Sequence, residues 1–141
     1  MSRDASASPG EEPRLWLVDG FNVLCAAVLG GRDRAEWWSE PRRTELLERA
    51  AAFDDPSAEV WIVFDGARPA VEPSTPSASQ RVREVFAPSA DEWLLARVRR
   101  VERPAALAVV TADRRVAARA RRRGARVVSP RAFLARCGEP V

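Results

Sequence analysis

The sequence predicts an α/β protein with a mainly parallel central sheet, and three observations lead to this. Short apolar runs alternate with segments of helical periodicity, a pattern that favours parallel strands joined by right-handed crossovers. Several of these runs are continuously apolar, as is typical of strands buried on both faces. The 141 residues, 46% of them hydrophobic, are enough for one domain with its own core.

Five strands are expected, at residues 15–18, 60–64, 82–86, 107–110 and 126–128. The first, second and fourth are continuously apolar, so we expect them at the centre of the sheet.

Helices are expected at residues 41–53, 90–100 and 113–123, and a short one follows Pro130. Gly124 stands where a glycine commonly ends a helix. The strand and helix pattern therefore runs through most of the chain as a single domain.

The expected domain covers residues 14–136. We expect a disordered tail at 1–13, a long flexible loop at 66–81 and a C-terminal tail at 137–141, because these stretches are rich in Pro, Ser, Gly or charge. No apolar run approaches eighteen residues and no leader-like segment begins the chain. A cytoplasmic protein without a membrane span is therefore expected, and its two distant cysteines are expected to be free thiols, with Cys137 exposed.

The residue types that the chain lacks exclude several kinds of catalytic site. The chain has no His, no Tyr and no Lys, and all 23 basic residues are Arg. This excludes a Ser-His-Asp or Cys-His nucleophile system, a His-ligated zinc site, a Lys Schiff base and a phosphate loop with its Lys. Catalysis in this chain would have to use carboxylates, hydroxyls, arginines and a bound metal ion.

Charge is distributed unevenly along the chain. Residues 1–96 hold 10 Arg and 17 acids, a balance of −7, whereas residues 97–136 hold 13 Arg and 2 acids, a balance of +11. A positive block of this size favours a polyanion as partner, although a solvated surface remains the alternative.

Acidic residues follow four of the expected strands. Asp19 and Asp65 come directly after their strands, Asp91 and Glu92 open the helix after the third, and Asp113 follows the fourth. Because a parallel α/β sheet binds ligands beyond the carboxyl ends of its strands, these acids are expected to share one edge.

Each acid also has a structural interpretation. Asp-Gly pairs at 19–20 and 65–66 are typical of turns. Ser89 and Glu92 fit a capping box, and Thr111 is a candidate cap for the helix that starts at Asp113.

Clustered carboxylates repel one another by roughly 4 kcal/mol per pair at about 4 Å, and a divalent cation would offset this. Oxygen ligands without His or a Cys pair favour Mg²⁺ or Mn²⁺. Such an ion makes a hydroxide nucleophile available near neutral pH without a His base. An acidic pocket beside an arginine-rich segment therefore suits a phosphodiester substrate.

With these residues in hand, the chain resembles the NYN family in its YacP-like branch, within the PIN-like nuclease superfamily. The matching motifs are LVDGFNV at 17–23, VFDG at 63–66, SADEW at 89–93, VVTADR at 109–114 and SPRAFL at 129–134.

The resemblance implies a Rossmann-like, PIN-like three-layer sandwich and Mg²⁺- or Mn²⁺-dependent endonucleolytic cleavage of RNA. By motif, Asp19, Asp91 and Asp113 are the catalytic, metal-holding acids, with Asp65 and Glu92 as outer metal ligands. The implied partner is single-stranded or messenger RNA, and the resemblance adds an expectation of ribosome association. The residues expected to bind substrate are Asn22, Thr111, Arg114, Arg115 and Arg119.

Tryptophans offer a second kind of RNA contact. Trp37 and Trp38 either stack on unpaired bases or pack a helix on the sheet. Trp16, Trp61 and Trp93 are expected in the core.

Three functions follow from these features. The first is a metal-dependent endoribonuclease, the second a non-catalytic RNA- or ribosome-binding protein with the same fold, and the third a phosphohydrolase or nucleotide-binding protein. The missing Gly-rich phosphate loop and the missing Lys count against the third.

Overall fold

The computed structural model describes residues 13–29, 40–66 and 81–138. The expectations for the N-terminal tail, for most of the 66–81 loop and for Trp37 and Trp38 lie outside these residues.

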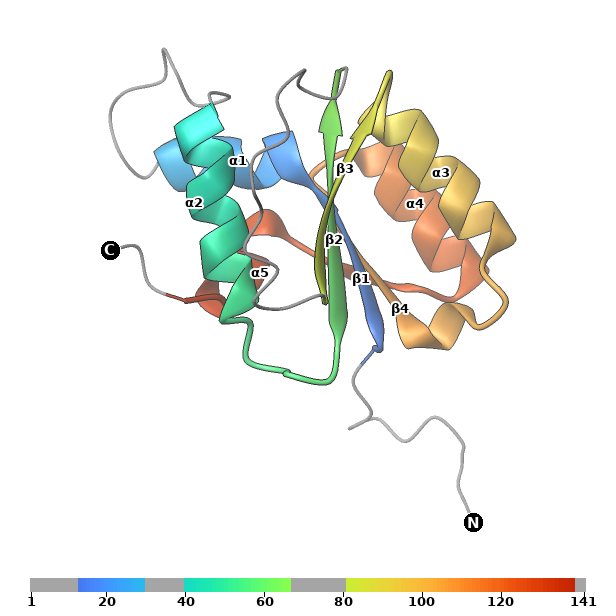
Figure 1. Cartoon of the computed structure of the whole chain (residues 1–141). Coiled ribbons are helices and arrows are strands. Elements are labelled where there is room, and N and C mark those ends of the chain that lie inside the picture. The colour runs from blue at the N-terminus through green and yellow to red at the C-terminus, as the bar shows by residue number, and fades with distance from the viewer. Residues whose placement is uncertain (1–12, 30–39, 67–80, 139–141) are drawn as a thin grey trace.

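A parallel sheet forms the centre of the molecule (Figure 1). Over the described residues it has five strands in the order β3-β2-β1-β4-β5, and every neighbouring pair is parallel. This confirms the α/β prediction. The strands are β1 (Leu15–Asp19), β2 (Glu59–Asp65), β3 (Val82–Ala87), β4 (Leu107–Val110) and β5 (Arg126–Val128).

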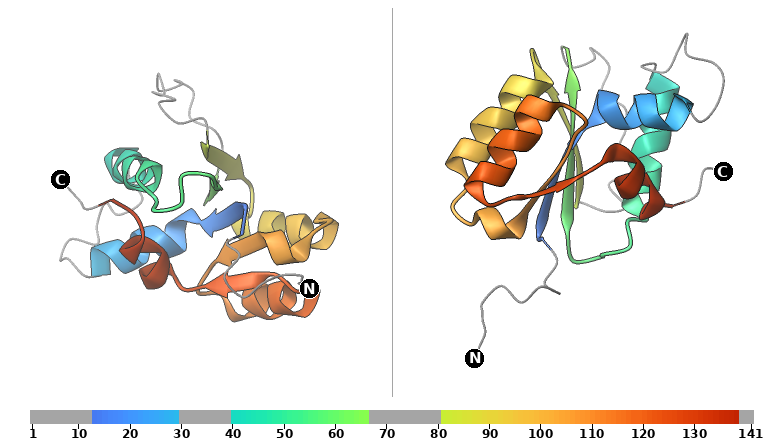
Figure 2. Two further views of the ribbon diagram at one scale, coloured as in Figure 1. Left: turned by 90° about the horizontal axis from the view of Figure 1, so that it is seen from below. Right: turned by 180° about the vertical axis from the view of Figure 1, so that it is seen from behind.

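Helices cover both faces of this sheet (Figure 2). One layer contains α1 (Gly20–Leu29), α2 (Glu40–Ala51) and α5 (Pro130–Ala135), and the other contains α3 (Ala90–Arg100) and α4 (Arg114–Arg123). A short 3₁₀ turn, η1 (Pro104–Ala106), leads into β4. Within the described ranges no helix has both the length and the apolarity needed to cross a bilayer.

The central strand β1 shows why the apolar runs are continuous. Trp16 and Val18 belong to the apolar cluster beneath α1, α2 and α5, whereas Leu17 belongs to the cluster beneath α3 and α4. The Trp16 ring lies 4.8 Å from that of Phe53 and 6.2 Å from that of Phe133, measured between centroids. Successive residues of β1 therefore face opposite layers of helices, as is typical of parallel strands covered on both faces.

Helix α1 is an element that the sequence interpretation missed. The Asp19-Gly20 pair resembled a turn, but the helix begins at Gly20 itself. A side chain at Gly20 would overlap the ring of Phe64, which packs directly against this glycine. The glycine is therefore a packing requirement at the start of a helix.

Two further expectations need correction. Trp61 and Trp93 were expected in the core beside Trp16, but both are only half-buried, whereas Trp16 is fully buried. Cys137 was expected in an exposed tail, but it is half-buried, and burial raises the pKa of its thiol to about 12. The next residue, Gly138, exchanges hydrogen bonds with Arg49 of α2, so the packed domain extends beyond residue 136.

Candidate functional site

The strand order creates a switch point between β1 and β4. The chain moves outward from β1 through β2 to β3, and then returns to β4 on the other side of β1. The helices that follow these two strands, α1 and α4, lie on opposite faces of the sheet. A crevice at the carboxyl ends of two such strands is the usual ligand site of an open parallel sheet.

Asp19, the last residue of β1, places a buried carboxyl group at this switch point. It is only 4% exposed, and its Oδ1 accepts a hydrogen bond of 3.2 Å from the backbone N–H of Asn22. The pKa of Asp19 is raised to about 6, mainly because burial disfavours the charged form. The negative charges of Asp91 and Asp65 raise this pKa further, against the backbone hydrogen bond, which lowers it.

Asp91 and Asp113 bring a second pair of carboxyl groups together from α3 and α4. The two side chains are hydrogen-bonded to each other. Burial raises the pKa of Asp91 first, followed by the charge of Asp113. The pKa of Asp113 is lowered, chiefly because its carboxylate accepts a 3.0 Å hydrogen bond from the backbone of Val116. The pair thus favours a proton on Asp91 and a charge on Asp113.

The two acids expected as outer metal ligands, Asp65 and Glu92, form contacts with α3 and α4. Asp65 ends β2, and its Oδ1 accepts a hydrogen bond from the backbone N–H of Ala90, at the start of α3. Glu92 forms a 2.9 Å ion pair with Arg115 across these two helices. Asp65 also adds negative charge beside Asp19 and Asp91. Its contact with α3 was not foreseen, because the two positions are 25 residues apart and no local pattern links them.

Asn22 joins α1 to the loop that leads into α4. Its side-chain oxygen accepts hydrogen bonds from the Thr111 hydroxyl at 3.2 Å and from the Ala112 backbone N–H at 2.7 Å. The Thr111 hydroxyl in turn accepts a 3.0 Å hydrogen bond from the backbone N–H of Asp113. Thr111 was a candidate cap of α4, but Asp113 is the N-cap residue, and Thr111 supports the backbone that presents it.

The oxygen donors at this edge of the sheet are of the type that Mg²⁺ binds. Asp19, Asp91 and Asp113 offer carboxylate oxygens, and the negative charge of neighbouring acids adds to the burial that raises the pKa values of Asp19 and Asp91. Over residues 13–29, 40–66 and 81–138, no three acids come close enough together to form a complete metal-binding group. Mg²⁺ is commonly held by one or two carboxylates, with water and substrate oxygens completing its shell, so the arrangement fits that mode of binding.

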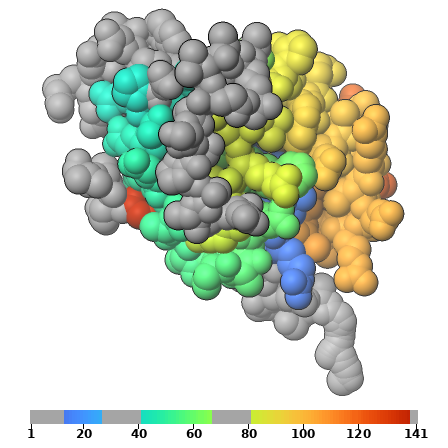
Figure 3. Space-filling model, in the orientation of Figure 1, coloured from blue at the N-terminus to red at the C-terminus, as the bar shows by residue number. Residues whose placement is uncertain are grey.

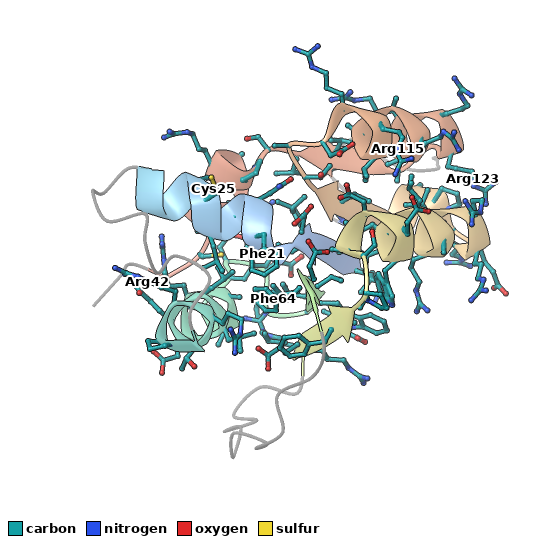
Figure 4. The ribbon with its side chains drawn as sticks, turned by 90° about the horizontal axis from the view of Figure 1, so that it is seen from above. Phe21, Cys25, Arg42, Phe64, Arg115 and Arg123 are labelled. Carbon is teal, nitrogen blue, oxygen red and sulfur yellow. The ribbon has the colours of Figure 1, made fainter. Side chains whose placement is uncertain are left out.

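The arginines of α4 fall into two groups. Arg114 and Arg119 are exposed, whereas Arg115 is bound by Glu92, which raises the pKa of its guanidinium. Arg123 donates to backbone carbonyls at the C-terminal end of α3, including those of Val98 and Val101. Figure 4 looks down on this edge of the sheet and labels Arg115 and Arg123 along α4, next to α3. Part of the arginine-rich helix therefore binds α3, and part faces solvent.

Known proteins share this architecture. No curated protein matches the sequence. The crystal structure of Rae1 (YacP) from Bacillus subtilis matches with a TM-score of 0.62 and 23% identity, over 86% of this chain and 71% of that one. The W164L mutant of the same protein matches with a TM-score of 0.59 and 23% identity, over 86% and 72% of the two chains.

The solved structures support the fold, and the family comparison shows which segment of the sequence matches. The motifs at the ends of β1 and β4 and at the start of α3 all lie inside residues 16–139, the segment matched by the family of YacP-like NYN domains. That segment contains every described strand except the first residue of β1. The chain therefore belongs to the YacP-like NYN domain family.

Proposed function

We propose that this protein is a Mg²⁺- or Mn²⁺-dependent endoribonuclease whose site lies at the carboxyl ends of β1 and β4. One or two of the acids Asp19, Asp91 and Asp113 would hold the cation directly, and the charge of the remaining acid would act on it through water, because no three described acids form a complete metal-binding group. When bound, such an ion neutralises charge at the scissile phosphate and makes a water molecule acidic enough to deprotonate near neutral pH.

The chain's own residues would then divide the remaining tasks. Asn22 and Thr111 fix the loop that presents Asp113. Asp65 holds the start of α3, so that Asp91 stays beside Asp113. The Glu92–Arg115 ion pair ties α3 to α4 and places one guanidinium near the acids.

The proposed substrate is single-stranded RNA, such as messenger RNA. The exposed Arg114 and Arg119 would bind its phosphates next to the acids, because α4 begins directly after Asp113. The family resemblance adds an expectation of ribosome association, which co-sedimentation of the protein with ribosomes would test.

One observation carries the proposal. The carboxyl groups of Asp91 and Asp113 are hydrogen-bonded to each other, and Asp19, which responds to the charge of Asp91, has a pKa raised to about 6. Acids forced together at a switch point cost stability unless a cation or a proton compensates. Strongly perturbed carboxyl groups in such a place are typical of functional sites.

A circular single-stranded RNA tests the proposal, because an exonuclease cannot begin on it. We expect the wild-type protein to linearise it with Mn²⁺ or Mg²⁺ and not with EDTA. Asp19→Asn should lower the rate by at least about a hundredfold, a loss in the range seen when one key electrostatic group is removed. Asp55→Asn removes the same charge before β2, at the opposite edge of the sheet, and should leave the rate unchanged.

Equal cleavage by wild type and Asp19→Asn, or cleavage that persists in EDTA, would contradict the proposal. The same circle made of DNA shows whether the sugar matters.

A second function, RNA binding without cleavage, is favoured by the finding that no three described acids form a complete metal group. RNA binding with no turnover in Mg²⁺, Mn²⁺ or any other divalent metal would establish it in place of the first.

A further inference from the structure

Two tryptophans and two arginines form a partly exposed ladder on the flank of α3. The guanidinium carbon of Arg83 lies 5.2 Å from the centre of the Trp61 ring, and that of Arg97 lies 4.8 Å from the same ring. Arg97 also lies 6.0 Å from the Trp93 ring, and the two indoles are 6.3 Å apart. We call Arg83, Trp61, Arg97 and Trp93 the Trp–Arg ladder.

The ladder and the carboxylate site share α3 and β2. Trp93 follows Asp91 by two residues on α3. Trp61 precedes Asp65 by four residues on β2, so both point to the same face of the sheet and are about 13 Å apart along the strand. The ladder therefore leads away from the site along α3 and the edge strand β3.

This flank differs from the one that α4 occupies. Contacts between α3 and α4 use Arg115 and Arg123, whereas the ladder joins α3 to β2 and β3. β3 is one of the two edge strands of the described sheet, and it adjoins α3 on the face shown in Figure 3, where both are yellow. Arg83 is exposed there, and the other three side chains are half-buried.

The ladder carries two arginines and has one carboxylate beside it, that of Glu59, which accepts a 2.9 Å hydrogen bond from the indole N–H of Trp61. Among the described residues, neither Arg83 nor Arg97 forms an ion pair, although both guanidinium groups lie against one indole. Guanidinium groups without an ion-pair partner can bind the phosphates of a polyanion. A polyanion with flat aromatic groups matches both chemical features of the ladder.

We propose that the Trp–Arg ladder is a binding subsite for a single-stranded RNA segment that continues out of the carboxylate site. Arg83 and Arg97 bind phosphates, and an unpaired base stacks on the indole of Trp93, as is common in single-strand recognition. The choice of RNA as the polymer rests on the proposed function, whereas the ladder itself does not.

The first test measures RNA binding without cleavage. Fluorescence anisotropy with a labelled oligouridine in EDTA compares wild type with the double variant Arg83→Gln/Arg97→Gln. We expect a Kd about tenfold higher, and a slope of log K against log salt that is shallower by about 1.4, because each single-strand phosphate contact contributes about 0.7. Arg14→Gln/Arg103→Gln removes two exposed arginines near the starts of β1 and β4 and should change neither quantity.

The second test separates stacking from charge. Trp93→Leu keeps an apolar side chain but removes the aromatic ring. We expect it to weaken binding of the oligouridine at least about fivefold and to leave binding of an abasic oligonucleotide of equal length unchanged. Thermal unfolding followed by circular dichroism checks that each variant is folded.

The outcomes distinguish this inference from the proposed function. If the double variant binds RNA like wild type, the ladder is not an RNA subsite, even when wild type cleaves. If Trp93→Leu weakens both oligonucleotides equally, or weakens neither, stacking on Trp93 is wrong. If the wild type binds through the ladder but never cleaves, the proposed nuclease function fails and the subsite stands. Binding of an acidic polypeptide at the ladder in place of RNA would also overturn the inference.

Discussion

The carboxyl group of Asp19 makes the stability of this protein depend on pH. Its pKa is about 6 in the folded chain and 3.8 in the unfolded reference. Because the folded pKa is the higher one, its stabilising contribution is complete below about pH 4 and is lost as the pH rises through about 6. The difference corresponds to about 3 kcal/mol.

We therefore predict that Asp19→Asn flattens this dependence in the absence of divalent ions. The side-chain oxygen of Asn retains the acceptor for the Asn22 backbone N–H. In EDTA, the variant should be more stable than wild type at pH 7, by up to about 3 kcal/mol, and nearly equal to it at pH 4. Urea unfolding at the two pH values measures the difference, and a variant less stable than wild type at pH 7 would refute this account of Asp19.

Asn22 is the residue that fixes the loop between β4 and α4. Asn22→Ala leaves the Thr111 hydroxyl and the Ala112 backbone N–H without their shared acceptor. We predict a loss of about 1–3 kcal/mol in the free energy of unfolding. Asn22→Asp keeps an acceptor there but adds a negative charge, so it should recover stability on acidification, whereas Asn22→Ala should not. Urea titrations of both variants at pH 4 and 7 test this positioning role.

Among the elements, α3 and α5 offer a matched comparison. Each begins at a serine whose hydroxyl accepts a backbone N–H three residues on, at 3.2 Å for Ser89 and 3.1 Å for Ser129. Ser89→Ala and Ser129→Ala should each cost about 1 kcal/mol of stability. Only α3 carries a site acid, Asp91, so only Ser89→Ala should weaken Mn²⁺ binding, measured by calorimetry. Equal affinities would show that the start of α3 does not position the site.

The elements also show what could be predicted from the sequence. The strands were predictable because a buried parallel strand needs a continuous apolar run, and each observed strand lies within two residues of its expected bounds. Helix α1 was missed because its sequence, GFNVLCAAVL, is also nearly continuously apolar and follows an Asp-Gly pair. Periodicity cannot separate such a helix from a buried strand.

The site was only partly predictable, for a related physical reason. Topology alone brings the acids to one edge, because parallel strands end on the same side. The pairing of Asp91 with Asp113 and the contact of Asp65 with Ala90 depend on where α3 and α4 pack, which no local pattern records. The half-burial of Trp61 and Trp93 depends likewise on how far α3 extends over β2 and β3.

For the whole molecule, two surfaces that each carry two arginines lie on opposite flanks of α3. The exposed Arg114 and Arg119 lie on α4, and Arg83 and Arg97 lie on the opposite flank. The acids lie near the starts of α3 and α4 and at the ends of β1 and β2. One RNA strand that crosses the acids would therefore touch both surfaces.

This arrangement predicts additive salt effects. Arg114→Gln/Arg119→Gln should make the slope of log K against log salt shallower by about 1.4, and its combination with Arg83→Gln/Arg97→Gln should make it shallower by about 2.8, if a single strand contacts all four arginines. The measurement is anisotropy of one labelled RNA in EDTA over a range of salt, with Arg14→Gln/Arg103→Gln as the charge-matched control. Contacts on one strand release their counterions in a single binding event, so their contributions to the slope add. If the fourfold variant changes the slope no more than either double variant does, the two surfaces bind separate strands.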